Sequence, residues 1–225
     1  MMDWTAVILS VKLALVTQLF LLPPAIICAR WLALTSFRGK PWIEGVLALP
    51  LVLPPTVIGY YLLVAMGGNS FLGRWFEALF GQPLAFSFSG LVVASVLVNI
   101  PFAVQPAQRA FEAISLEVHE AAKCCGLTFW QTFHRIELPL AWPGILSAMM
   151  MTFAHTLGEF GVVLMVGGGI PGETQTLSIS IYDRVQAFDF SSAGTMSLLL
   201  LVISLVTIAI SYGMVERLMR RRRSS

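Results

Sequence analysis

The chain has 225 residues, of which 57% are hydrophobic and 12% are charged, and its mean hydropathy is +0.81. A charged fraction of about half that of an ordinary soluble domain excludes a water-soluble globular protein and favours a protein embedded in a lipid bilayer. The formal net charge of +2 comes from basic residues that flank apolar segments, so the sequence predicts no basic patch for nucleic acid.

Apolar residues fall in five blocks, each long enough to cross a membrane, because about 20 apolar residues span the hydrocarbon core. The sequence therefore predicts an all-α, polytopic membrane bundle of about five transmembrane helices, in a single domain over residues 1–225. The predicted spans are Thr5–Leu32, Trp42–Met66, Phe88–Ala110, Trp142–Val166 and Ala193–Val215.

Prolines interrupt the first two spans. Pro23–Pro24 lies in the middle of the first span, where it predicts a packing kink. Pro54 and Pro55 precede Gly59 in the second span, and a broken helix of this kind is typical of a transport path. A kink that serves packing alone stays open as the alternative for Pro50, Pro54 and Pro55.

The third span is flanked and interrupted by polar residues. The preceding connection, Gly67–Ser87, has the composition of a short helix at the membrane interface. Asn99 and Gln105 within the span are costly against lipid, so they are expected to face the bundle. Inside the bundle, Asn99 and Gln105 could either line a water-filled path or form hydrogen bonds between helices.

The next connection, at about residues 111–140, is the most polar long connection of the chain. Ser115 can cap a helix over Leu116–Cys125, and Gly126 can adopt the left-handed conformation that ends such a helix. The connection is therefore expected to begin with a short helix and a glycine elbow.

A second helix is predicted to follow the elbow. Thr128 and Gln131 have the spacing of a capping box at a helix start. Pro139 is predicted to stop this helix, and Pro143 is predicted to lie in the first turn of the fourth span, where its missing N–H costs nothing.

The fourth span carries two ionisable residues. His155 and Glu159 are four residues apart, so they share one helix face and can pair. With Gly158 and Gly161 they are candidates for a pore or gate, because ionisable residues inside a membrane are often functional. Alternatively, Glu159 reaches external water, about 26 Å from the inner surface, while His155 is a hydrogen-bonded core residue.

A glycine-rich loop, Gly167–Gly169, follows the fourth span. A phosphate-binding loop needs a Lys-Ser or Lys-Thr pair at the start of a helix, and the chain has no such motif. We therefore expect no ATP, metal or other cofactor in this chain, and no catalytic residue.

The distribution of basic residues predicts the orientation in the membrane. If residues 111–140 are cytoplasmic, only Lys12, Arg74 and Arg184 of the fourteen basic residues lie outside, in agreement with the positive-inside rule. The N-terminus is then external and the C-terminus cytoplasmic. The terminal run Arg220–Arg223 is expected to anchor the chain at the lipid headgroups.

The connection at residues 111–140 resembles the signature loop of ABC importer permeases. In that family the loop docks on an ATPase subunit, so the resemblance implies a coupling role; an ordinary cytoplasmic helical hairpin is the alternative. The matching residues are Glu120, Ala121, Ala122, Gly126, Ile136, Leu138 and Pro139.

Over nearly its whole length the chain is also similar to the molybdate permeases of this family. The similarity is carried by Leu49–Pro55 with Gly59, by Leu157–Gly161 and by Ile170–Thr174. That family usually has arginine where His155 stands. Sulfate, thiosulfate and tungstate permeases are related alternatives.

The resemblance implies the fold of a type I ABC importer permease in the bacterial inner membrane, with a periplasmic N-terminus. It implies a homodimer with an ATPase subunit dimer on the cytoplasmic side, where ATP and Mg²⁺ bind the partner. It also implies a periplasmic solute-binding protein that selects the anion. The competing function classes are a self-contained secondary transporter, which predicts inverted repeats, and a membrane enzyme.

Overall fold

The computed structural model describes the backbone of residues 2–223 and the side chains of residues 2–210 and 212–214. Every regular element in this part of the chain is helical. The elements are α1 (Trp4–Leu34), α2 (Lys40–Val52), α3 (Pro55–Met66), α4 (Phe71–Phe80), α5 (Phe88–Glu112), α6 (Leu116–Cys124), α7 (Phe129–Thr132), the π-helical turn η1 (Phe133–Glu137), α8 (Leu138–Gly158), α9 (Gly161–Gly167), α10 (Leu177–Gln186) and α11 (Phe190–Arg223).

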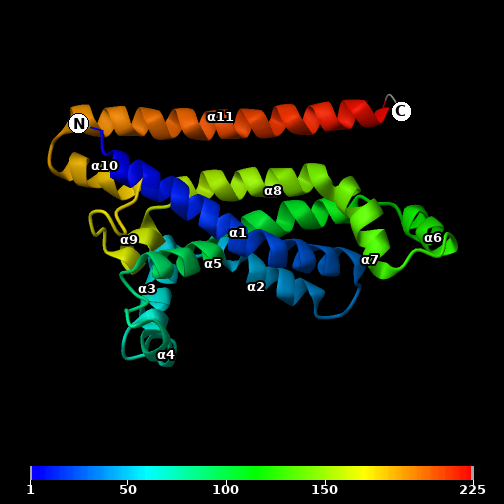
Figure 1. Cartoon of the computed structure of the whole chain (residues 1–225), viewed down its shortest axis with the longest axis horizontal. Helices are drawn as coiled ribbons and strands as arrows, with labels where there is room; N and C mark the ends of the chain where they lie inside the picture. The colour runs from blue at the N-terminus through cyan, green and yellow to red at the C-terminus, as the bar shows by residue number, and fades with distance from the viewer. Residues whose placement is uncertain (1, 224–225) are drawn as a thin grey trace.

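The predicted all-α bundle is confirmed. Within residues 2–223, four helices are long and apolar enough to cross a membrane, and the bent pair of α2 and α3 makes a fifth candidate. These spans run along the long axis of the molecule, whereas α3 turns away from it (Figure 1).

The centre of the bundle is formed by α1, α5 and α8, which pack on one another, while α11 lies beside α8 (Figure 1). Small side chains let these backbones approach closely, as in many membrane bundles. The buried residues of this core are Leu21, Ala25, Ala29, Leu32, Ala103, Val104, Ala107, Phe111, Phe133, Ala141 and Ile145.

The predicted interruption of the second span is confirmed and is sharper than a kink. The helix stops after Val52 and resumes at Pro55, and the two halves are bent by 106°. Pro54 and Pro55 lack backbone N–H groups, so they cannot continue the hydrogen bonds of α2. In contrast, α1 continues through Pro23–Pro24 as one helix.

The predicted boundaries of the fourth span are wrong at both ends. Helical structure runs without a break from Phe129 to Gly158, so Pro139 does not stop a helix and Pro143 lies inside one. The N–H of Leu138 donates to the carbonyl of Phe133, five residues back, and this wider π turn accommodates the proline that follows.

The outer end of this helix is also earlier than predicted, at Gly158 instead of Val166. Glu159 adopts an extended conformation with φ −65° and ψ 129°, and a separate helix, α9, starts at Gly161. The fourth span is therefore broken in its outer part, as the second span is.

The helix predicted between Gly67 and Ser87 is present as α4. The Ser70 hydroxyl accepts a hydrogen bond of 2.8 Å from the N–H of Gly73, and Gly81 ends the helix with a φ of 70°. Its position at the membrane interface stays a prediction.

Gly144 marks a close approach of α8 to α5. A Cβ atom at this position would lie 2.3 Å from the Cβ of Ala110 and 2.9 Å from the carbonyl oxygen of Pro106. Gly144→Ala is expected to force the helices apart, at a cost of about 1–3 kcal/mol. The thermal unfolding midpoint of the detergent-purified protein should fall.

Gly194→Ala is the matched control, because a Cβ atom there would have no neighbour within 4 Å. It is expected to leave the midpoint unchanged or slightly raised. Equal midpoints for the two variants would show that α5 and α8 do not approach as closely at Gly144 as described.

Candidate functional site

The segment that connects α5 and α8, residues 111–140, lies at one end of the long axis; we call it the coupling segment (Figure 1). Gly126 has a φ of 71°, as predicted for the end of the first helix. The capping box is confirmed, since the N–H of Thr128 donates to Oε1 of Gln131 over 2.9 Å. Ser115 occupies the cap position of α6, but its side chain makes no capping hydrogen bond.

The residues that match the signature loop differ in exposure. Ala122 is buried, and Ile136 and Leu138 are half-buried, so these three support the segment from within. The exposed ones are Glu120, Ala121, Gly126 and Pro139. Phe129 and Trp130 are also exposed, by 60% and 64%, which gives this end of the molecule an apolar surface.

Sequence analysis missed the contact that anchors the coupling segment. Glu137, in η1, has a side chain only 1% exposed and pairs with Arg30 of α1. The two residues are 107 positions apart, so their spacing carries no local signal. The position of Glu137 between Ile136 and Leu138 of the signature pattern was the available hint.

Three of the candidate pore or gate residues, Pro55, Gly59 and Gly161, lie where α3 meets α9. A Cβ atom on Gly59 would lie 2.7 Å from the Cβ of Met165, and one on Gly161 would lie 2.7 Å from the Cβ of Pro55. The two glycines thus allow close backbone approach. Pro54 and Gly158 are exposed, at the break of the second span and the end of α8 respectively.

His155 and Glu159 form the predicted pair, with 3.7 Å between Nε2 of His155 and Oε2 of Glu159. Glu159 is only 9% exposed, so most of its side chain lies inside the bundle. Its Oε1 accepts a 3.1 Å hydrogen bond from the N–H of Val162, and its carbonyl accepts one of 2.7 Å from the hydroxyl of Ser178. Glu159 therefore fastens the break between α8 and α9 to α10.

The other face of His155 contacts α5. Its Nδ1 lies 3.1 Å from Oδ1 of Asn99, and its ring stacks on Phe102 with 4.1 Å between centroids. Asn99 is fully buried and donates to the carbonyl of Ser95 over 2.8 Å. Hydrogen bonding within the bundle thus accounts for Asn99, whereas Gln105 is exposed.

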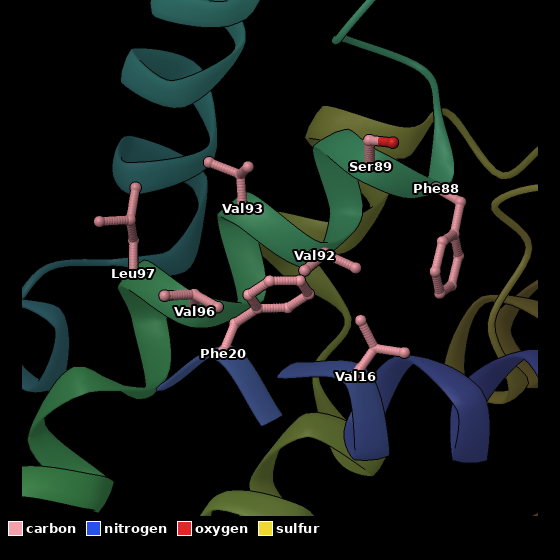
Figure 2. Close-up of a pocket in the computed structure, with 8 residues that line it drawn as sticks. All are labelled: Val16, Phe20, Phe88, Ser89, Val92, Val93, Val96 and Leu97. Atoms are coloured by element: carbon pink, nitrogen blue, oxygen red, sulfur yellow. The ribbon is translucent and has the colours of Figure 1, made fainter. Parts of the chain in front are cut away.

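An apolar cavity of about 490 Å³, open to the surface of the bundle, lies between α1 and α5. Figure 2 shows valine, phenylalanine and leucine side chains around this space, with Ser89 as the polar exception. An oxyanion needs several donors or positive charges. This cavity therefore offers no binding site for one.

The contacts of Glu159 with Val162 and His155 give these residues a structural role at the helix break. The described residues include no group of three or more histidine, cysteine or acidic side chains arranged to hold a metal ion. A carboxylate buried beside a histidine fixes a helix break, and it would repel an anion that approached it.

Comparison with known proteins agrees with this geometry. Residues 22–224 match the family described as the inner membrane component of binding-protein-dependent transport systems. The chain belongs to this family. Its members are transport components of a membrane, in agreement with the apolar spans found here.

Relatives within the family are similar over most of their length. A protein of Azotobacter vinelandii is 48% identical over 85% of this chain and 84% of its own. Proteins of Haemophilus influenzae and Escherichia coli K12 are 38% and 37% identical, over 98% and 93% of this chain and 96% and 92% of their own. All three are named molybdenum transport system permease proteins.

Solved structures share the fold at low sequence identity. The bacterial ABC transporter that imports alginate matches with a TM-score of 0.75 and 18% identity, over 95% of this chain and 78% of that one. The methionine ABC transporter matches with a TM-score of 0.69 and 14% identity, over 96% and 93% of the two chains. The predicted fold of a type I ABC importer permease is thereby confirmed.

Proposed function

We propose that this chain is the membrane-spanning subunit of an ATP-driven importer that carries molybdate across the bacterial inner membrane. The observation that supports this substrate best is the 37–48% identity to molybdenum permeases over at least 84% of each relative. The sulfate permease of Escherichia coli is 33% identical, and the match covers only 61% of that protein. Sulfate is therefore the second candidate.

The proposed assembly contains two copies of this chain, each a single domain over residues 1–225, and an ATPase dimer that binds ATP and Mg²⁺. The coupling segment, residues 111–140, is the docking surface for the ATPase. Its exposed Glu120, Ala121 and Gly126, beside the exposed rings of Phe129 and Trp130, support this role. A periplasmic solute-binding protein would deliver the anion at the other end.

This assignment orients the chain with its N-terminus in the periplasm and its C-terminus in the cytoplasm. The first turn of α1 and the last turn of α11 lie at opposite ends of the long axis, and the coupling segment lies at the same end as the last turn of α11 (Figure 1). The side chains of Arg220–Arg223, expected to anchor the chain at the headgroups, lie outside the described residues.

The continuous helix from Phe129 to Gly158 suggests how movement reaches the gate. Its last 21 residues form α8, which extends about 32 Å from the coupling segment to the break at Glu159. ATP binding would close the ATPase dimer and draw the two coupling segments together. The helix would then shift the packed break formed by Gly161 and Pro55, which opens the path to the periplasm.

Selection of the anion belongs to the binding protein in this proposal. Glu159 disfavours an anion nearby, and a transport path must also release what it admits. We therefore expect the bundle to provide passage without a tight site.

Uptake in cells tests the proposal. A bacterial strain without its own molybdate permease should accumulate molybdenum from trace molybdate when this chain is expressed with its ATPase and binding protein. Omission of the ATPase is the control and should abolish accumulation. Uptake that persists without the ATPase would support a secondary transporter, and accumulation of sulfate instead would support the second candidate.

A further inference from the structure

Arg30, near the inner end of α1, holds the coupling segment by two parallel contacts. Its Nη2 donates to Oε1 of Glu137 over 2.9 Å, and its Nε pairs with Oε2 of the same carboxylate. The two side chains are 15% and 1% exposed. Such a two-point contact fixes direction as well as distance, because the guanidinium and the carboxylate are both planar.

The same guanidinium lies over two aromatic rings of the coupling segment. Its central carbon is 4.3 Å from the ring centroid of Phe129, in α7, and 5.5 Å from that of Phe133, in η1. Stacking of this kind attracts a cation and limits its rotation. Arg30 is thus held on one side by a carboxylate and on the other by aromatic faces.

The first helix of the coupling segment, α6, contacts this cluster through His119. Its Nε2 lies 3.3 Å from Oε1 of Glu137, without the alignment of a hydrogen bond, and its Nδ1 lies 3.2 Å from the carbonyl of Ser115. A cavity of about 420 Å³ opens beside the cluster, lined in part by Arg30, His119 and Glu137. The cluster of Arg30, His119 and Glu137 therefore forms part of the wall of this cavity.

The outer half of α1 connects to the break at Glu159. The hydroxyl of Ser10 accepts a 2.8 Å hydrogen bond from the N–H of Leu177, at the start of α10. The next residue of α10, Ser178, donates to the carbonyl of Glu159. Thus α1 touches the coupling segment at one end and, through α10, the helix break at the other.

We infer that Arg30 is a positioning residue that fastens α1 to the coupling segment through Glu137. As a consequence, α1 acts as a second lever that packs against α8, so that movement of the coupling segment reaches both sides of the break. The inference rests on the proposed function, because it assigns a task within ATP-driven transport. The ion pairs of Lys40 and Arg109 at this end are more exposed; in the pair of Arg109 with Glu112, the arginine is 81% exposed.

The test is the amount of molybdate transported per ATP hydrolysed by the complete complex in proteoliposomes. Arg30→Gln and Glu137→Gln should each lower this ratio about tenfold, because ATPase movement then reaches α8 without α1. Exchange of the two charges in the double variant Arg30→Glu with Glu137→Arg should recover at least a third of the loss. Such a recovery of the transport ratio is expected only if the ratio depends on the ion pair between positions 30 and 137.

Arg109→Gln is the matched control, since it removes an exposed arginine from an ion pair at the same end and should leave the ratio unchanged. If Arg30→Gln does not reach the membrane, Arg30→Lys is measured in its place. Lysine keeps the charge but cannot make the two-point contact, so this variant should lower the ratio about threefold. If the Arg30 and Glu137 variants transport as much molybdate per ATP as the wild type, the inference is overturned while the proposed function still stands. A wild-type complex without ATP-dependent uptake would instead overturn the proposed function.

Discussion

Replacement of Gly126 by leucine is expected to abolish ATP-dependent uptake while the protein still inserts into the membrane. Gly126 ends α6 with a φ of 71°, and no atom lies within 4 Å of the position that a Cβ would occupy. A leucine side chain would therefore project outward into the proposed docking surface. The expected loss is at least 30-fold in uptake, together with loss of the ATPase during copurification.

Backbone strain has to be separated from this steric effect. A residue other than glycine at a positive φ costs about 1–2 kcal/mol, whatever the size of its side chain. Gly126→Ala is the control, because alanine carries the same backbone strain as leucine and adds only a Cβ atom, which would have no neighbour within 4 Å. It should keep at least a third of the uptake. Equal losses with alanine and leucine would attribute the defect to the elbow, and normal uptake with leucine would contradict the docking role.

Glu159→Ala is expected to reduce uptake more than tenfold, because it removes the side chain that holds the break between α8 and α9. Alanine cannot accept the hydrogen bond from the N–H of Val162, and it removes the carboxylate that lies beside Nε2 of His155. A buried donor without an acceptor costs about 1–3 kcal/mol. Initial rates of molybdate uptake at equal amounts of membrane protein measure the effect.

Glu159→Gln separates hydrogen bonding from charge. Glutamine still accepts from Val162, so this variant should keep at least half of the uptake. Glu77→Ala, at an exposed site of α4, controls for the loss of an external carboxylate and should have no effect. If glutamine and alanine at position 159 reduce uptake equally, the charge of Glu159 is required and its bracing role is refuted.

Much of the fold follows from local sequence features. Long apolar blocks predict the spans, and the pairing of His155 with Glu159 follows from their separation of four residues. The bend of the second span follows from Pro54 and Pro55, since neither has a backbone N–H. These features depend on neighbours in the chain, so the sequence contains them.

The remaining features depend on contacts between distant segments. Glu159, Phe160 and Gly161 sit inside an apolar run that favours a continuous helix, yet the helix ends there and Gly161 packs against Pro55 of α3. Likewise, the π turn that admits Pro139 lies where Glu137 meets Arg30, far away in sequence. Local propensity predicts neither the break nor the turn, because tertiary packing decides both.

The central claim is that ATP hydrolysis by a partner drives molybdate through a bundle made of this chain. Its most direct test is uptake of labelled molybdate into proteoliposomes that contain this chain and its ATPase, with the binding protein outside and ATP inside. We predict uptake that requires both ATP and the binding protein, and that a hundredfold excess of sulfate reduces by less than half. Uptake that continues without ATP, or that sulfate abolishes while labelled sulfate accumulates, would contradict the claim.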